Sequence, residues 1–115
     1  MSYIKIESEY SDLDKYIKKY DEDEDDDENE DGNIFYCKKD TYIKHNPYGP
    51  AFTRKNGYKS YYIENKLHRL DGPARIYAYG REEYWINNKL LNKEEFDIHP
   101  ERLKYLGKEH LICLT

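Results

Sequence analysis

Hydrophobic and polar positions repeat at one fixed interval across the middle of the chain. Residues 45–67 and residues 68–90 align without a gap, so equivalent positions lie 23 residues apart. Aromatic and aliphatic residues occupy the same places in both segments, as at Tyr61 and Tyr84. An ungapped repeat of this kind is typical of stacked supersecondary units. The pattern therefore predicts two tandem β-hairpin repeats, 45–67 and 68–90.

Each repeat contains two turn signals that bound its strands. Asn56-Gly57 predicts a type I′ hairpin turn, because both residues tolerate positive φ, and Tyr79-Gly80 occupies the same place in the second repeat. The second turn falls at Glu64-Asn65 and at Asn87-Asn88, where asparagine suits the left-handed region. Strands of the repeats are therefore expected between these four positions.

Period-two alternation in the strands places apolar side chains on both faces of the predicted sheet. Tyr61 and Ile63 fall on one face and Tyr62 on the other, and Trp85 occupies the place of Tyr62 in the second repeat. Either both faces are covered, or one of them is a binding surface.

The segments before the repeats predict a strand, a helix and further strands. Tyr3–Glu7 alternates as a strand does. Ser11–Tyr20 predicts a helix, because a hydroxyl N-cap is followed by an acidic residue three positions later and apolar residues recur at helical spacing. Asn33–Lys39 and Thr41–Lys44 predict one or two strands that lead into the first repeat.

The segment after the repeats predicts two short capping helices. Leu91 stands where a third repeat would place histidine, and Asn92–Glu95 has the N-cap pattern of a helix. His99–Gly107 predicts a second helix, with proline in its first turn and glycine after its end. Leu111–Leu114 is either a final strand or a packed tail.

Together these elements predict a single α+β domain, mainly β with capping helices, built on an antiparallel sheet. Its expected parts are an N-terminal strand and helix (1–20), an acidic linker (21–32), strands (33–44), two repeats (45–90) and a C-terminal helical cap and tail (91–115).

Composition limits the core and the class of protein. Only 37% of the residues are hydrophobic, but 16% are aromatic and 14 are tyrosines, so much of the buried area must come from amphipathic rings. The sequence shows no apolar segment approaching roughly 18 residues and no leader pattern, which predicts a soluble, intracellular protein without a membrane partner. Cys37 and Cys113 lie far apart, which favours a reducing compartment, although a disulfide between them remains an alternative.

Charge is divided unevenly along the chain. The net charge is −5, but ten carboxylates lie within residues 21–31, which leaves 14 acidic residues against 19 lysines and arginines elsewhere. These ten form a candidate interaction element: Asp21, Glu22, Asp23, Glu24, Asp25, Asp26, Asp27, Glu28, Glu30 and Asp31. The acidic run has three interpretations. It is a solvated loop, or it is an interaction element that engages a basic partner surface or mimics a phosphate backbone toward a nucleic-acid-binding protein. The third is a strap on the basic body or a weak site for divalent cations.

The segment Tyr62–His68, together with the 23-residue period, resembles MORN repeats, short β-hairpin units that stack into an elongated sheet. It is most similar to a MORN-like variant written aromatic-x-Asn-Gly-Lys-Leu-His-Arg-x-Asp-Gly-Pro-Ala, known from tailed phages and large DNA viruses. Glu64-Asn65 and Asn87-Asn88 depart from its Asn-Gly, and Asn46-Pro47-Tyr48 departs from its Arg-x-Asp. The resemblance implies an interaction or scaffolding module in the host cytoplasm or the virion.

Several residues of the repeat are assigned to its own structure. These are His45, Gly49, Pro50, Gly57, His68, Asp71, Gly72, Pro73 and Gly80. Two histidines near Asp71 would be a possible metal pair, but we favour a local cluster of His68, Arg69 and Asp71 that orders the following loop, and predict no metal. No nucleophile motif or phosphate-binding loop is found, so we predict a non-enzymatic protein without a cofactor.

Aromatic and basic residues interleave across the repeats. Six of them are assigned to a partner-binding sheet face: Tyr58, Tyr62, Arg75, Tyr77, Arg81 and Trp85. Such a mixture suits both base stacking and protein hot spots, and the negative net charge favours a protein partner, viral or host. Alternatives are an inhibitor that uses the acidic run as a nucleic-acid mimic, and a nucleic-acid binder gated by that run. Asn33–Lys39, as an unpaired outer strand, would allow a homo-oligomer.

Overall fold

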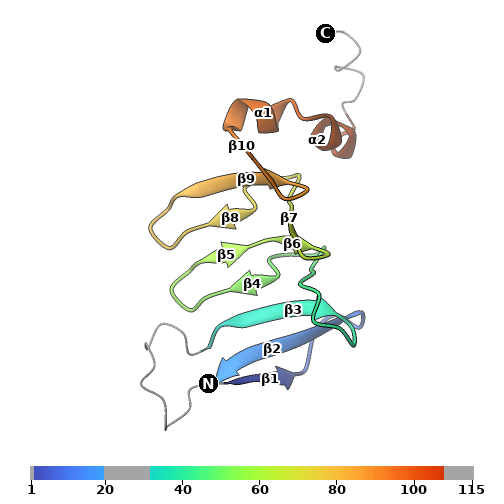
Figure 1. The fold of residues 1–115 in the computed structure, drawn as a ribbon, viewed down its shortest axis with the longest axis vertical. Helices are drawn as coiled ribbons and strands as arrows, with labels where there is room; N and C mark the ends of the chain where they lie inside the picture. Colours follow the sequence, from blue (N-terminus) through green and yellow to red (C-terminus); the bar gives the residue numbers. More distant parts are fainter. Residues whose placement is uncertain (1, 20–31, 108–115) are drawn as a thin grey trace.

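A computed structural model describes residues 2–19 and 32–107. Within them lies an eight-stranded antiparallel sheet in the order β1-β2-β3-β4-β5-β8-β9-β10, with β6 and β7 as a separate hairpin (Figure 1). Two short helices follow the last strand, and the molecule is elongated, 61 × 32 × 19 Å. The predicted mainly β class with C-terminal helices is confirmed. The acidic run and the predicted Leu111–Leu114 element lie outside the described residues.

The elements are short. The strands are β1 (Ser2–Ile6), β2 (Leu13–Lys19), β3 (Ile34–Lys38), β4 (Phe52–Thr53), β5 (Lys59–Ser60), β6 (Tyr62–Ile63), β7 (Lys66–Leu67), β8 (Arg75–Ile76), β9 (Glu82–Ile86) and β10 (Lys89–Leu91). The helices are α1 (Lys93–Asp97) and α2 (Pro100–Tyr105).

The predicted helix over Ser11–Tyr20 is wrong, because most of this segment forms strand β2. It pairs with β1 on one side and β3 on the other. Tyr16 lies opposite Phe35, with the two rings stacked at a centroid distance of 4.9 Å. Leu13 is buried at the start of the strand. Pairing on both sides outweighs the helical spacing of the apolar residues, since strand preference depends on such neighbours.

Strand β3 lies inside the sheet, between β2 and β4. The prediction that Asn33–Lys39 is an outer strand available to a second copy is therefore wrong. Thr41–Lys44 contributes no strand of its own, only an isolated bridge between Cys37 and Lys44.

Backbone hydrogen bonds in residues 45–90 recur at equivalent places. The bond from the Asn46 N–H to the Tyr62 carbonyl is matched by the bond from Arg69 to Trp85. In the same way, Ala51 to Ser60 is matched by Ala74 to Glu83, and Arg54 to Tyr58 is matched by Tyr77 to Arg81. In each pair of bonds, the second follows the first by 23 residues. The two segments thus close their hairpins in the same register.

The two kinds of turn differ in backbone conformation. Gly57 has a φ of 104°, but Asn56 is not in the left-handed region, and the Gly57 N–H donates to the carbonyl of Arg54. The predicted type I′ turn at Asn56-Gly57 is therefore wrong, and the loop has a glycine bulge instead. At Glu64-Asn65 and Asn87-Asn88 both residues have positive φ, as a type I′ turn requires.

The two helices close one end of the sheet. Asn92 caps α1 in a capping box with Glu95, as the sequence predicts, and α2 begins with proline after the His99 N-cap. Phe96 of α1 is buried in a cluster with Ile86 and Leu91. The helices thus cover the β10 end of the sheet (Figure 1).

Candidate functional site

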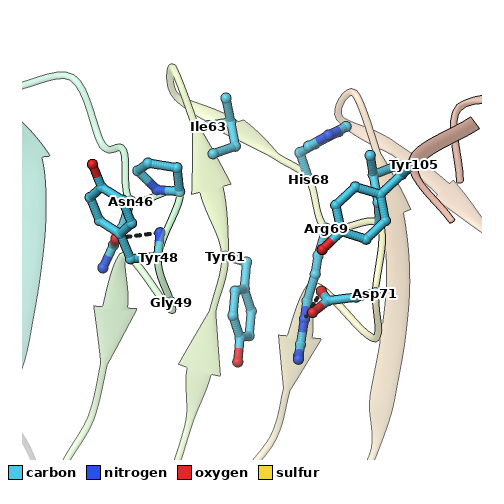
Figure 2. Close-up of a pocket in the computed structure, with 11 residues that line it drawn as sticks. Asn46, Tyr48, Gly49, Tyr61, Ile63, His68, Arg69, Asp71 and Tyr105 are labelled. Carbon is cyan, nitrogen blue, oxygen red and sulfur yellow. Dashed lines mark hydrogen bonds and ion pairs between the residues drawn. The ribbon is translucent and has the colours of Figure 1, made fainter. Parts of the chain in front are cut away.

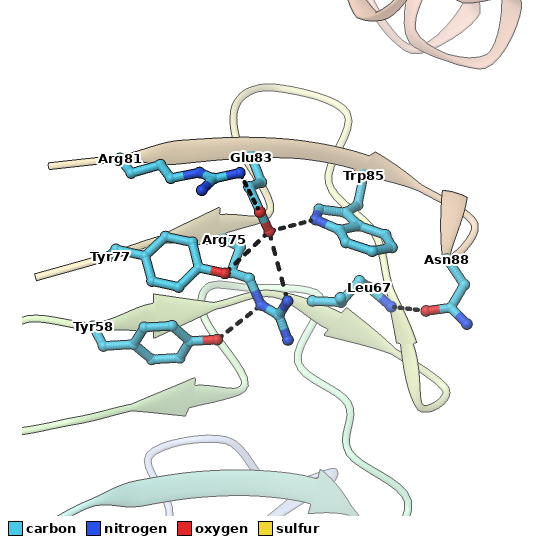
Figure 3. A network of polar contacts seen from close by, with 8 residues as sticks. All are labelled: Tyr58, Leu67, Arg75, Tyr77, Arg81, Glu83, Trp85 and Asn88. Carbon is cyan, nitrogen blue, oxygen red and sulfur yellow. Dashed lines mark hydrogen bonds and ion pairs between the residues drawn. The ribbon is translucent and has the colours of Figure 1, made fainter. Parts of the chain in front are cut away.

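The structure brings the predicted partner-binding residues together on one face of the sheet, which we call the aromatic face. Four of the six contact the side chain of Glu83, and a fifth, Tyr58, is joined to it through Arg75 (Figure 3); the four are Arg75, Tyr77, Arg81 and Trp85. Glu83 itself was missed by the sequence reasoning. Its signal was its place two residues before Trp85, which puts both side chains on one face of the strand.

One carboxylate holds this cluster. The Trp85 indole N–H donates to Glu83 Oε1 at 3.1 Å, and the Tyr77 hydroxyl donates to the same oxygen at 3.3 Å. Arg75 and Arg81 approach the carboxylate at 3.6 and 3.3 Å. The Glu83 side chain is only 11% exposed. Two rings and two guanidinium groups are therefore fixed by a single, largely buried anion.

Arg75 links this carboxylate to the next hairpin. Its Nε donates to the Tyr58 hydroxyl at 2.9 Å, and its guanidinium lies 5.7 Å from the centroid of the Trp85 ring. Burial lowers the pKa of Arg75. The hydroxyls of Tyr58, Tyr77 and Tyr62 together raise this pKa by more than burial lowers it, so the net shift is upward. This guanidinium stays charged throughout the ordinary pH range. Tyr62, the sixth predicted residue, lies in β6, where the Lys44 ammonium is 5.1 Å from the centroid of its ring.

A ladder of rings extends from the cluster across the aromatic face. Tyr77 lies between Tyr58 and Tyr79, with centroid distances of 5.5 Å to each. Phe52 lies 6.0 Å from Tyr58, and the exposed Arg54 lies over both of these rings. The face is therefore a row of ordered rings bordered by cations.

The ladder continues into the N-terminal strands. Phe52 pairs in register with Phe35, which stacks on Tyr16 and meets Tyr3 edge-on at 4.7 Å. Rings thus run from β1 to the β8–β9 hairpin along one face of the sheet.

The repeated histidines support the turns. His45 Nδ1 accepts a hydrogen bond from the Glu64 N–H, and His68 Nδ1 accepts one from the Asn87 N–H, each at 3.0 Å. Burial lowers the pKa of both imidazoles, so the neutral, accepting form is favoured. Among residues 2–19 and 32–107, no group of three or more potential metal ligands is found.

The predicted cluster before Gly72-Pro73 is correct for two of its three members. Arg69 Nε donates to Asp71 at 2.9 Å, and the same guanidinium donates to the Pro73 carbonyl at 3.0 Å. His68 is the exception, because its Nδ1 accepts a hydrogen bond from the Asn87 N–H instead.

A groove of about 420 Å³ lies on the opposite face, between the loops that precede β4 and β8 (Figure 2). Tyr48, Tyr61 and Tyr105 contribute rings to it. Its charged groups, Arg69 and Asp71, pair with each other, and Arg69 lies 4.0 Å from the centroid of Tyr61. The groove therefore offers shape and aromatic surface, while its charged groups already have partners.

Cys37 is unsuited to nucleophilic chemistry. It is fully buried, and burial raises the pKa of its thiol to about 11. The protonated thiol is a poor nucleophile. Cys113 lies outside the described residues.

Comparisons of the chain with protein-family models, curated proteins and solved structures find no match. In the described part of the chain, neither helix has the length and apolar character needed to cross a membrane.

Proposed function

We propose that this chain is a non-enzymatic protein–protein interaction module that binds a partner through the aromatic face. We also propose, from the resemblance to the MORN-like variant, that it is an accessory or minor virion protein of a virus, with a viral or host protein as partner. The observation that carries the first proposal is the anchoring of Trp85, Tyr77, Arg75 and Arg81 by Glu83.

Anchoring matters because binding is weakened by the entropy lost when side chains become ordered. On the aromatic face the rings of Tyr58, Tyr77 and Trp85 are already half-buried and hydrogen-bonded before any partner arrives. Tryptophan, tyrosine and arginine are also the residues most enriched in binding hot spots. A rigid surface of these types supports recognition of a protein.

The charge arrangement favours a protein over a nucleic acid. Arg75 and Arg81 share the Glu83 carboxylate, so a phosphate would have to compete with an anion that is already in place. Nucleic-acid binding relies on cations that neutralise phosphates. The proposal therefore assigns these arginines to holding rings and to short-range polar contacts with a protein.

We further propose that residues 45–67 and 68–90 are two copies of a MORN-like hairpin unit. The recurrence of hairpin hydrogen bonds 23 residues apart supports this, as does the repeated support of a turn by His45 and His68. In such units neighbouring hairpins hold one another, which gives a scaffold for an extended binding face.

Affinity capture with the full chain tests the proposed surface. The bait proteins are the natural sequence, Arg81→Ala, Trp85→Ala and the control Lys59→Ala, whose exposed side chain lies on the other face of the sheet. We expect one partner from infected cells to be retained by the natural sequence and the control, and lost by the two aromatic-face variants. Binding of the purified partner is then compared by calorimetry.

Two outcomes would contradict the proposal. Equal capture by all four baits would place the binding surface elsewhere. A fifth bait carries residues 21–31 changed to asparagine, glutamine and serine, and loss of the partner by this bait alone would favour the acidic run as the active element.

A further inference from the structure

The two ends of the sheet differ in what covers them. At the β10 end, α1 packs against β9 and β10 and buries Phe96. At the other end, β1 pairs with β2 on one side, and no described element lies along its outer side (Figure 1). Tyr3 and Ile4 of this strand are 41% and 45% exposed. One end is capped, and the other presents a strand edge.

The β1 edge has few of the devices that usually prevent pairing with another strand. Exposed edges are commonly protected by proline, by a bulge or by free charges. β1 has neither proline nor a break in its five-residue ladder with β2. Its one charge, Lys5, is 3.2 Å from the Asp14 carboxylate on the adjacent strand. The unpaired backbone groups of β1 are therefore open to a further strand.

We propose that β1 pairs antiparallel with β1 of a second copy of this chain, about a two-fold axis at Ile4. In this register Ile4 lies opposite its own equivalent, and Tyr3 lies opposite Lys5 of the second copy. The lysines thus meet tyrosine rings rather than each other, an arrangement that cation–π attraction favours. A register centred on Lys5 would place two lysines opposite each other, which is destabilising.

The same register preserves the faces of the sheet. Residues opposite each other in an antiparallel pair lie on the same face. Tyr3 belongs to the aromatic face, through its contact with Phe35, so the ladders of the two copies would join into one. Ile4, on the other face, would cover its equivalent and lose its exposure. This self-association stands apart from the proposed partner binding and does not rest on it.

Cross-linking tests both the edge and the register. Opposite residues of an antiparallel pair have Cα atoms about 4.5–5.5 Å apart, within the range of disulfides. In the full chain carrying Cys113→Ser, we expect Ile4→Cys to give a disulfide-linked dimer on mild oxidation. Tyr3→Cys, which would lie opposite Lys5, and Leu90→Cys, at the capped end, are the matched controls. Equal cross-linking of all three variants, or none for Ile4→Cys, would overturn the proposal.

Sedimentation of the chain without added cysteines provides the second test. We expect the natural sequence to self-associate with increasing concentration and Ile4→Val to behave alike. Ile4→Lys sets two like charges opposite each other and should weaken the association by up to about fivefold. Circular dichroism establishes that each variant is folded. A natural sequence that stays monomeric, or an Ile4→Lys variant that associates equally well, would refute the proposal.

Discussion

At the scale of single residues, the Glu83 carboxylate holds four side chains, those of Arg75, Tyr77, Arg81 and Trp85. We predict that Glu83→Gln lowers the free energy of unfolding by about 1–2 kcal/mol, because hydrogen bonds to charged groups contribute more than neutral ones and Arg75 and Arg81 lose their shared anion. The midpoint of urea unfolding measures this, with an unchanged denaturant slope. Glu82→Gln, at the exposed neighbouring position on the other face, is the control. Equal destabilisation by the two changes would mean that the contacts of Glu83 add no more to the free energy of unfolding than those of an exposed carboxylate.

The histidines make stability depend on pH. Burial lowers the folded-state pKa of His45 and His68 below 6.5. As the pH falls through this range, the unfolded chain takes up protons more readily than the folded chain. The two histidines therefore support the folded state fully above pH 6.5, and this contribution to the free energy of unfolding is lost at lower pH. A protonated Nδ1 also cannot accept from the turn N–H. We predict a decrease in the free energy of unfolding between about pH 7.5 and pH 5, measured by urea titration at each pH.

A double variant separates this effect from the carboxylates. His45→Gln with His68→Gln keeps an acceptor at each position but cannot titrate. Its stability should change less over the same pH interval. An identical pH profile for the variant and the natural sequence would assign the effect to other groups.

At the scale of elements, the Glu64-Asn65 turn depends both on its backbone conformation and on a side-chain hydrogen bond. Asn65 has a φ of 66°, and its side-chain oxygen accepts from the Lys44 N–H at 2.7 Å. We predict that Asn65→Gly loses only this bond, whereas Asn65→Ala also loses the ability to adopt the left-handed region easily. The alanine variant should be less stable than the glycine variant by about 1 kcal/mol, as measured by thermal or urea unfolding. Similar stability of the two variants would show that backbone strain is unimportant at this turn.

The same elements show what the sequence could and could not predict. The positions of the four turns follow from local chemistry, but Asn56-Gly57 suits either a type I′ turn or a glycine bulge, and the hydrogen bond from Arg54 to Tyr58 decides between them. For β2, apolar residues fit both helical and strand spacing, and the pairing with β1 and β3 decides. The contact between Glu83 and Arg75 likewise depends on strands meeting in register, which local patterns do not contain.

At the scale of the whole molecule, the apolar core is concentrated at one end. Ile86, Leu91 and Phe96 form a buried cluster there, with Leu70 and Tyr84 packed against it. Elsewhere in the described part of the sheet the buried apolar residues are spread along its axis, and they are Leu13, Tyr36, Cys37, Ala51, Leu67 and Ala74. In a linear stack each unit contacts mainly its neighbours, so stability need not be uniform along the axis.

The capped end should therefore lose structure first when its core is weakened. Phe96→Ala leaves a cavity under α1 and is expected to cost about 3–5 kcal/mol locally, a large share of the stability of a small domain. We predict that amide hydrogen exchange accelerates most in β9, β10 and α1, less in β5 and β8, and least in β1–β3. Leu106→Ala, at an exposed position beyond α2, is the control and should leave exchange unchanged. If Phe96→Ala instead accelerates exchange equally in every strand, the sheet unfolds as one cooperative unit, and its hairpins do not behave as a linear array.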